Sequence, residues 1–320
     1  MRIFKDVLTG DEMTSDTFEM TTEYEDAILK VPSKNRPKDD LGDVDIGCGD
    51  AFTKPEGAAE EAPAQGNVEM VLDVVANHDL KQVNMLPGLR LVRFPKKVQE
   101  AIIGSGHQHG VYRSMRPDGC ELRFVSSSER IDVEVMAIGE DSIASVFYGS
   151  RFHKNIVLPA GKIVTITLKI PDQFKISDLK KLDANRDKSS SFAPYLWRLQ
   201  FGLQVFVHYL GINSYGVPVR PPKDDEVPSV KMLSYGSSIT CGMCATCYMN
   251  SYVNKTAVYL GADSFNKGMS GSCFIEGATA DYFSTFKAEL CTLELGINMC
   301  GLFEVEEFKS RVEYLLKKVH

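Results

Sequence analysis

The chain has 320 residues, of which 43% are hydrophobic and 25% are charged, a composition typical of globular proteins and a length that allows two or three domains. A net charge of −7 without a basic cluster argues against nucleic-acid binding, and no apolar run is long enough for a membrane span. The first residues lack the apolar core of a signal peptide, so the 8 cysteines predict reduced thiols and a cytoplasmic location.

The first 85 residues predict a β-rich segment that is interrupted by a polar loop. Residues 1–35 alternate short strand-like pieces with polar turns. Residues 36–66 are rich in Asp, Glu, Gly, Pro and Ala, a composition that buries too little apolar surface to stay ordered and therefore predicts a mobile acidic loop. Residues 67–80 return to a β-branched sequence typical of a buried strand.

Three short stretches in this segment carry a family pattern: FKDVLTGDEM at 4–13, VDIG at 44–47 and VLDVVANHDL at 71–80. With them, the segment resembles translationally controlled tumour protein. The resemblance implies a β-rich body and a protein or metal partner, namely tubulin, a Ras-type small GTPase or calcium. It places Glu12 at the family's GTPase contact. The residues alone also allow Asp11 and Glu12 to be a simple turn between strands. The family's long helical hairpin is missing here, since the chain changes character at Leu86–Gly88.

Residues 87–225 predict a β-sandwich. Strands are expected at 122–125, 131–135, 145–148, 154–158, 163–170, 197–201 and 205–209, because β-branched and aromatic runs alternate there with turn signals. Residues 218–226 are expected to form a stiff linker. His107 and His109 stand among glycines and are interpreted as surface histidines of a loop, with a metal-binding pair as the alternative.

Residues 228–320 predict an α/β unit with strands at 231–235, 263–266 and 290–294 and helices at 248–260, 278–287 and 304–319. Ser238 follows the first strand, Gly271 the second and Asn298 the third. Residues just past the carboxyl ends of parallel strands converge on one crevice. There, the Ser238 hydroxyl can attack an acyl carbon, and the Gly271 N–H and the Asn298 amide can hold the developing oxyanion.

These blocks, Gly236-Ser-Ser238, Gly271 and Gly296-Ile-Asn298, resemble those of the SGNH (GDSL-type) hydrolases. The resemblance implies an esterase- or lipase-like enzyme without a cofactor that acts on a small acyl ester, carbohydrate acetyl esters being the family-level expectation. It also implies a fold that is α/β plus all-β. In that fold, a partial flavodoxin-like three-layer domain lies behind a β-sandwich that resembles a carbohydrate-binding module.

The D-x-x-H block, which supplies the family's histidine base, is absent from the sequence. His320 has no aspartate two or three residues ahead of it, so a base would have to come from elsewhere, with His153 and His208 as candidates. The chain is therefore expected to be a truncated, incomplete hydrolase. Two alternatives remain: a non-catalytic binding protein acting through residues 1–85, or a composite gene product without activity. The latter predicts an unpaired sheet edge beside residues 290–294.

Cys241, Cys244 and Cys247 form a C-x₂-C-x₂-C run similar to those that hold iron–sulfur clusters. A fourth ligand cannot be assigned, and the run directly follows the proposed nucleophile, where a cluster would occupy the substrate crevice. We therefore interpret it as a loop of small residues entering a helix and predict no metal site.

Overall fold

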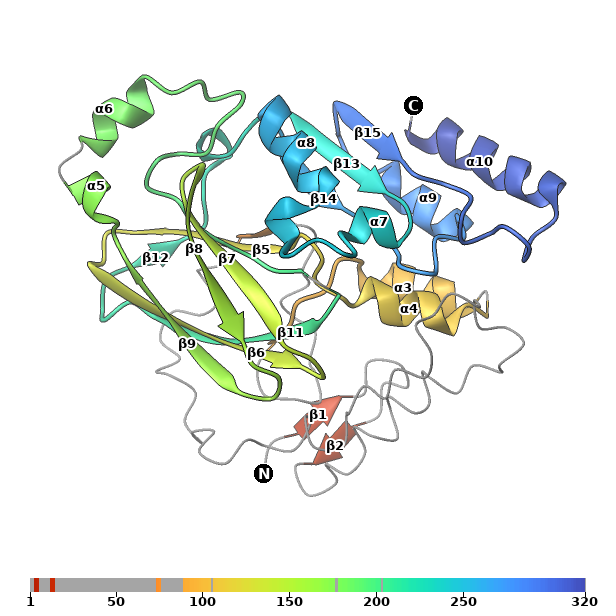
Figure 1. Cartoon of the computed structure of the whole chain (residues 1–320), viewed down its shortest axis with the longest axis horizontal. Helices are drawn as coiled ribbons and strands as arrows, with labels where there is room; N and C mark the ends of the chain where they lie inside the picture. The colour runs from red at the N-terminus through yellow and green to blue at the C-terminus, as the bar shows by residue number, and fades with distance from the viewer. Residues whose placement is uncertain are drawn as a thin grey trace.

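The computed structural model describes residues 3–5, 12–14, 73–75, 89–104, 106–175, 178–202 and 204–319 (Figure 1). The predicted acidic loop at 36–66 lies outside these residues. Strand β1 (Ile3–Lys5) pairs antiparallel with β2 (Glu12–Thr14), so the backbone of Glu12 belongs to a strand. Strand β3 (Asp73–Val75) pairs antiparallel with β5 (Glu121–Ser126), so it joins a sheet formed by later residues of the chain.

Two antiparallel sheets form the middle of the molecule. The first has the order β12-β5-β10-β7-β8, with β7 (Ser142–Tyr148), β8 (Arg151–Leu158), β10 (Trp197–Gln200) and β12 (Val219–Arg220). The second has the order β4-β11-β6-β9, with β4 (Leu89–Arg90), β6 (Arg130–Ile138), β9 (Ile163–Lys169) and β11 (Phe206–Asn213). Each of the seven strands predicted for this region is present.

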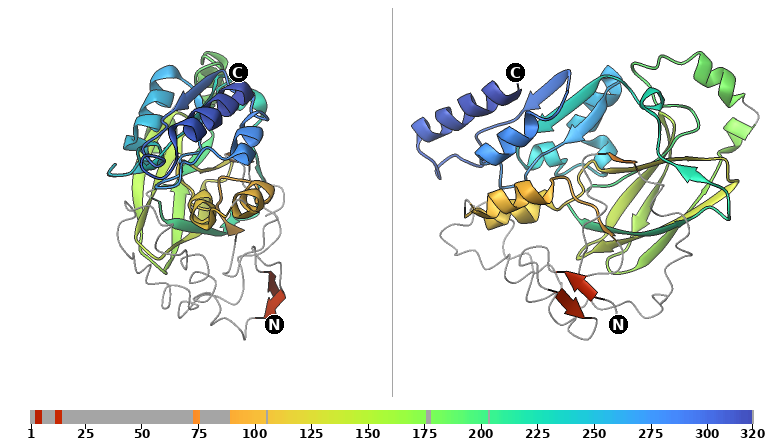
Figure 2. Two further views of the ribbon diagram at one scale, coloured as in Figure 1. Left: turned by 90° about the vertical axis from the view of Figure 1, so that its right-hand side faces the viewer. Right: turned by 180° about the vertical axis from the view of Figure 1, so that it is seen from behind.

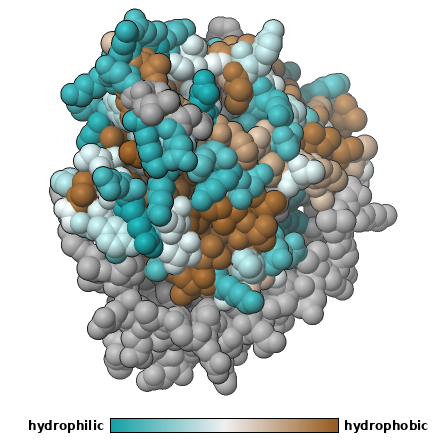
Figure 3. Space-filling model, turned by 60° about the vertical axis from the view of Figure 1, so that its left-hand side comes forward, coloured by the Kyte–Doolittle hydropathy of each residue, from teal (hydrophilic) through white to brown (hydrophobic). Residues whose placement is uncertain are grey.

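One apolar core fills the space between these two sheets. Phe124 and Trp197 of the first sheet and Val133 and Tyr209 of the second belong to the same buried cluster. Because successive side chains of a strand point to opposite faces, each strand gives this core every other residue. Apolar side chains also reach the surface on the face of the molecule that Figure 3 shows. On β8, Phe152 and Val157 are exposed.

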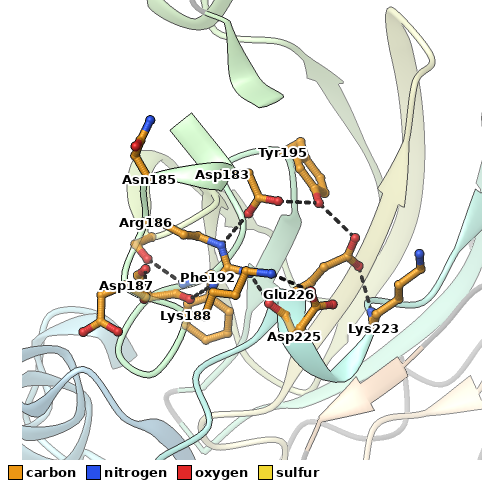
Figure 4. A network of polar contacts seen from close by, with 12 residues as sticks. Asp183, Asn185, Arg186, Asp187, Lys188, Phe192, Tyr195, Lys223, Asp225 and Glu226 are labelled. Carbon is orange, nitrogen blue, oxygen red and sulfur yellow. Dashed lines mark hydrogen bonds and ion pairs between the residues drawn. The ribbon is translucent and has the colours of Figure 1, made fainter. Parts of the chain in front are cut away.

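The connection from the two sheets to the next strand is pinned by a polar network (Figure 4). Glu226, in the 3-10 helix Asp224–Glu226, accepts hydrogen bonds from Arg220 at 2.7 Å and from Tyr195 at 3.1 Å. The Tyr195 hydroxyl also bonds Asp183 at 3.2 Å, at the end of helix α6 (Leu179–Ala184), which follows α5 (Asp172–Lys175). The predicted linker is thus held by side chains as well as by its prolines.

The last part of the chain forms a parallel sheet with the order β14-β13-β15, in which β13 is Lys231–Tyr235, β14 is Asp263–Asn266 and β15 is Leu290–Leu293. Helix α8 (Tyr252–Leu260) packs on the face of Met232, while α9 (Gly277–Phe283) and α10 (Val305–Val319) pack on the face of Tyr235. Ser251 caps α8 by accepting the Asn254 N–H at 3.2 Å, which sets its start later than predicted.

Helices α3 (Lys96–Gly104) and α4 (Gln108–Ser114) lie between β4 and β5 in sequence but share the apolar core of the parallel sheet. Ile102 and Tyr112 belong to the same buried cluster as Tyr235 and Phe283. The prediction of a loop with surface histidines at 107–109 was therefore wrong for His109, which lies in α4 and is buried. No helix in the described ranges has the length and apolar character needed to cross a membrane.

Candidate active site

The turn after β13 presents Ser238 at the start of a short helix, α7 (Ser238–Cys241). Ser238 is partly exposed, whereas Ser237 and Thr240 on either side are buried. Gly236 is required at the turn, because a Cβ there would lie 2.3 Å from the Thr240 Oγ1 and 2.8 Å from the backbone oxygen of Glu294. The absence of a side chain at 236 thus allows the chain to reverse closely enough to expose Ser238.

Glu294, directly after β15, holds this turn from the neighbouring strand. Its carboxylate accepts the Ser237 N–H at 2.7 Å and the Ser237 hydroxyl at 2.5 Å. The Glu294 N–H in turn donates to the Tyr235 carbonyl at 2.9 Å. Glu294 is not among the site residues predicted from the sequence. The available signal was its position as the first residue past a predicted strand, beside the block that ends in Asn298.

Hydrogen bonds also join the segments that carry Gly271 and Asn298. The Met269 N–H donates to the Gly236 carbonyl at 2.7 Å, which brings the segment after β14 against the turn after β13. Asn298 is buried, and its side-chain oxygen accepts the Cys273 N–H at 3.2 Å. Because this bond occupies the side-chain oxygen, the Nδ2 amide of Asn298 is the end left to donate to a substrate. Gly271 has φ +62°, a left-handed conformation that suits glycine.

Two histidines of the α3–α4 region lie against the segment after β14. The His109 Nδ1 is 2.7 Å from the Ser272 hydroxyl, and its Cε1 lies 3.9 Å from the position of a Cβ on Gly271. The His107 ring stacks on Phe274, with centroids 4.1 Å apart, and hydrogen-bonds Glu276. No pattern in the sequence marks these contacts, because they join residues that lie far apart along the chain and meet only through tertiary packing.

The two histidines named as substitute bases belong to the antiparallel sheets. His208 is fully buried on β11, and the Arg90 Nε lies 3.4 Å from its Nε2. His153 lies on β8, where burial, and then the charge of Lys154, lower its pKa. His320 lies outside the described residues. The structure therefore places His109 beside Gly271, whereas the two histidines predicted as bases, His153 and His208, lie on strands of the antiparallel sheets.

The cysteine run after Ser238 is divided between the interior and the surface. Cys241 and Cys247 are buried, and Cys244 is exposed with a φ of +66°. Burial raises the pKa of the Cys241 thiol to about 12, which disfavours the thiolate that a metal would need. Across the described ranges, no group of three or more His, Cys, Asp or Glu side chains is arranged to hold a metal ion.

Residues 1–97 match the family model "Translationally controlled tumour protein". A translationally-controlled tumor protein homolog from Aspergillus oryzae (strain ATCC 42149 / RIB 40) is 34% identical over 99 residues, which cover 31% of this chain and 53% of that protein. The chain thus spans about half the length of this curated relative. The resemblance of the first segment to this family is confirmed, and the matched range extends into β4 and the start of α3.

The salicylyl-acyltransferase SsfX3 from a tetracycline biosynthetic pathway aligns with this structure at a TM-score of 0.59 and 13% identity, over 81% of this chain and 70% of that chain. The chain therefore shares its fold. A putative GDSL-like lipase from Bacteroides ovatus ATCC 8483 also aligns, at a TM-score of 0.40 and 15% identity, over 65% of this chain and 61% of that one. At 13% identity, the likeness to the acyltransferase concerns the fold alone.

Proposed function

We propose that residues 89–320 form an acyl-ester hydrolase or acyltransferase unit with Ser238 as its nucleophile. One observation carries the proposal: hydrogen bonds tie together the segments that follow β13, β14 and β15, and each of these segments bears one of the predicted groups. The shared fold with an acyltransferase supports chemistry of this class. In this reading, the two antiparallel sheets are a β-sandwich, and the parallel sheet is a partial flavodoxin-like domain.

In the proposed reaction, the Ser238 Oγ attacks the carbonyl carbon of a small acyl ester. The Gly271 N–H and the Asn298 Nδ2 amide donate hydrogen bonds to the oxygen that becomes negatively charged. Collapse of this intermediate breaks the bond to the ester oxygen, which takes up the proton lost by the Ser238 hydroxyl, so an alcohol leaves and an acyl-serine remains. Water then releases the acid in a hydrolase, or a second hydroxyl takes the acyl group in a transferase. Carbohydrate acetyl esters are the substrates that the family resemblance favours.

A serine hydroxyl is a weak nucleophile without a base, and the sequence after Asn298 contains no D-x-x-H block. We assign His109 a positioning role, because its ring bonds Ser272 and lies beside Gly271. Oxyanion donors and binding without a full triad retain on the order of 10³–10⁴-fold catalysis over water. Slow turnover is therefore expected of Ser238, Gly271 and Asn298 when no base acts on the serine.

A fluorophosphonate probe tests the assignment, because it forms a bond to an activated serine and needs no knowledge of the substrate. The Ser238→Ala variant is expected to lose labelling. Ser310→Ala removes an exposed hydroxyl on α10 and should label like the unmodified chain. Mass spectrometry of the labelled peptide identifies the modified serine. Labelling that persists in Ser238→Ala would refute the nucleophile assignment.

A second candidate function rests on residues 1–97, which match translationally controlled tumour protein. We propose that this segment binds a protein partner, with Glu12 in the contact and a small GTPase as the first partner to test. Charge reversal by Glu12→Lys should weaken binding of the full chain in a titration. Glu140→Lys, at an exposed position just after β6, is the matched control. Equal affinity of the two variants would argue against this role for Glu12.

A further inference from the structure

The parallel sheet has an open edge at β15. Within the described residues, β15 pairs with β13 alone. The Glu294 N–H points to β13, since it bonds the Tyr235 carbonyl. Backbone groups alternate in direction along a strand, so Cys291 and Leu293 direct their N–H and C=O groups away from β13. Cys291 is also exposed. An unpaired edge at this strand was the expectation of one alternative, a composite gene product, and an open edge alone does not decide for that alternative.

Helix α10 borders this edge and has three distinct sides. In Figures 1 and 2 it lies at the outer end of the α/β unit, past β15. Its core side carries the buried Leu315, and on one flank Tyr314 and Lys318 both bond Asp281 of α9 at 2.7 Å.

The opposite flank of α10 faces away from α9 and carries exposed apolar side chains between the charged Lys309 and Glu313. Val305 and Leu316 lie on it, eleven residues or about three helical turns apart, with the partly buried Val312 between them. Their side chains are 58% and 47% exposed. Exposed apolar side chains on a helix beside an unpaired strand edge are the combination that a further strand and helix would cover.

The charges along α10 indicate what covers this surface. Glu304 directly precedes the helix, and Lys317 lies in its last turn. A second copy of the same helix placed antiparallel would bring acidic start against basic end at both extremities. Such self-complementarity is what a two-fold interface requires.

We propose that two copies of this chain pair through β15 and α10. A two-fold axis perpendicular to the sheet sets β15 antiparallel to β15 of the second copy, with Cys291 opposite Leu293 of that copy. The two parallel sheets then join into one. Both α10 helices stay on the same face, so that Val305 packs against Leu316 of the second copy and Glu304 lies near its Lys317. This interface is independent of the proposed activity.

Sedimentation velocity of the 320-residue chain over a wide dilution series tests the pairing. The unmodified chain should form dimers whose dissociation constant rises with salt, because the end charges are screened. Leu316→Glu should shift the chain to monomer. Cys291→Pro should do the same while keeping the fold, since it removes an N–H that points away from β13. Tyr259→Glu, at an exposed position on α8, is the control and should remain dimeric.

A charge swap separates this geometry from other dimers. Lys317→Glu alone should weaken the dimer by setting acid against Glu304 of the second copy. Adding Glu304→Lys should restore it, because the opposite charges then meet again in exchanged places. A chain that stays monomeric at the highest concentration reached would overturn the proposal. So would a dimer that is indifferent to Leu316→Glu and Cys291→Pro.

Discussion

A buried ionic network joins the antiparallel sheets to the parallel sheet, and its central group is Glu121 on β5. The Glu121 carboxylate accepts bonds from Arg198 at 2.5 and 2.7 Å, from Arg123 at 2.8 Å and from Gln200 at 3.0 Å. Arg123 also donates two hydrogen bonds, of 2.6 and 2.8 Å, to the carboxylate of Asp263, the first residue of β14. Replacement of Glu121 by Gln therefore removes the charge that balances two buried guanidinium groups.

The size of the effect follows from the pKa of Glu121. Burial alone would raise this pKa, but Arg198 and Arg123 outweigh it and lower the pKa from 4.5 to about 2. One pKa unit corresponds to about 1.4 kcal/mol, so the shift contributes about 3 kcal/mol to folding. Because the folded pKa lies below the unfolded one, this stabilisation is complete above about pH 4.5 and is lost as the pH falls towards 2. Breaking a buried ion pair costs about 3–5 kcal/mol at neutral pH.

The chain carries its own reporter, since its 1 tryptophan, Trp197, is buried beside Arg198. Urea unfolding followed by its fluorescence, at pH values from 7 to about 3, gives the free energy of unfolding in each condition. Glu121→Gln should be less stable at neutral pH and should lose less stability on acidification than the unmodified chain. Glu313→Gln, exposed on α10, is the control. Parallel pH profiles for Glu121→Gln and the unmodified chain would refute the reasoning.

Three further outcomes are expected. Lys267 is fully buried, and burial lowers its pKa well below the usual value. The free energy of unfolding of the unmodified chain should therefore rise between neutral pH and about pH 10, and Lys267→Met should remove this rise. The same pH dependence of the unfolding free energy in both chains would contradict this. Gly236→Ala should cost about 1–3 kcal/mol in urea unfolding and reduce Ser238 labelling, because the new Cβ meets backbone; an unchanged stability would count against the turn geometry. His109→Ala should lose probe labelling of Ser238, whereas His109→Asn can keep the hydrogen bond to Ser272 and should retain labelling. Equal loss in both variants would mean that the imidazole takes part in the reaction and does not only position Ser272.

The α/β unit was predictable from the sequence to within a few residues. The strands at 231–235 and 263–266 have the predicted limits, and β15 ends one residue earlier. β13 and β15 are short, mainly apolar runs, whereas β14 has Phe265 as its one apolar residue. A helix follows each strand along the chain, which is the pattern of a parallel sheet. The strand-end positions of Ser238 and Asn298 follow from this local pattern, because strand ends are fixed by neighbouring residues.

Helices α3 and α4 and the contacts of His109 were not predictable in this way. Gly106 and Gly110 suggested a loop, but Gly110 lies inside α4, where a Cβ would come within 2.5 Å of the His107 ring. His109 meets Ser272 across 163 residues of sequence. Such a pairing depends on tertiary packing, and a single sequence carries no periodic signal for it. The same holds for the Arg123–Asp263 link between the sheets.

Arg93 shows that the end of the tumour-protein-like match is part of the α/β core. The match runs to residue 97, yet Arg93 is fully buried and donates to the backbone oxygens of Arg113 at 3.0 Å and Gly268 at 2.5 Å. Its own carbonyl accepts a bond from Lys267. Removal of this guanidinium would leave the buried backbone oxygens of Arg113 and Gly268 without these hydrogen bonds, which is costly. The last residues of the match therefore contribute to the core that holds the segment after β14.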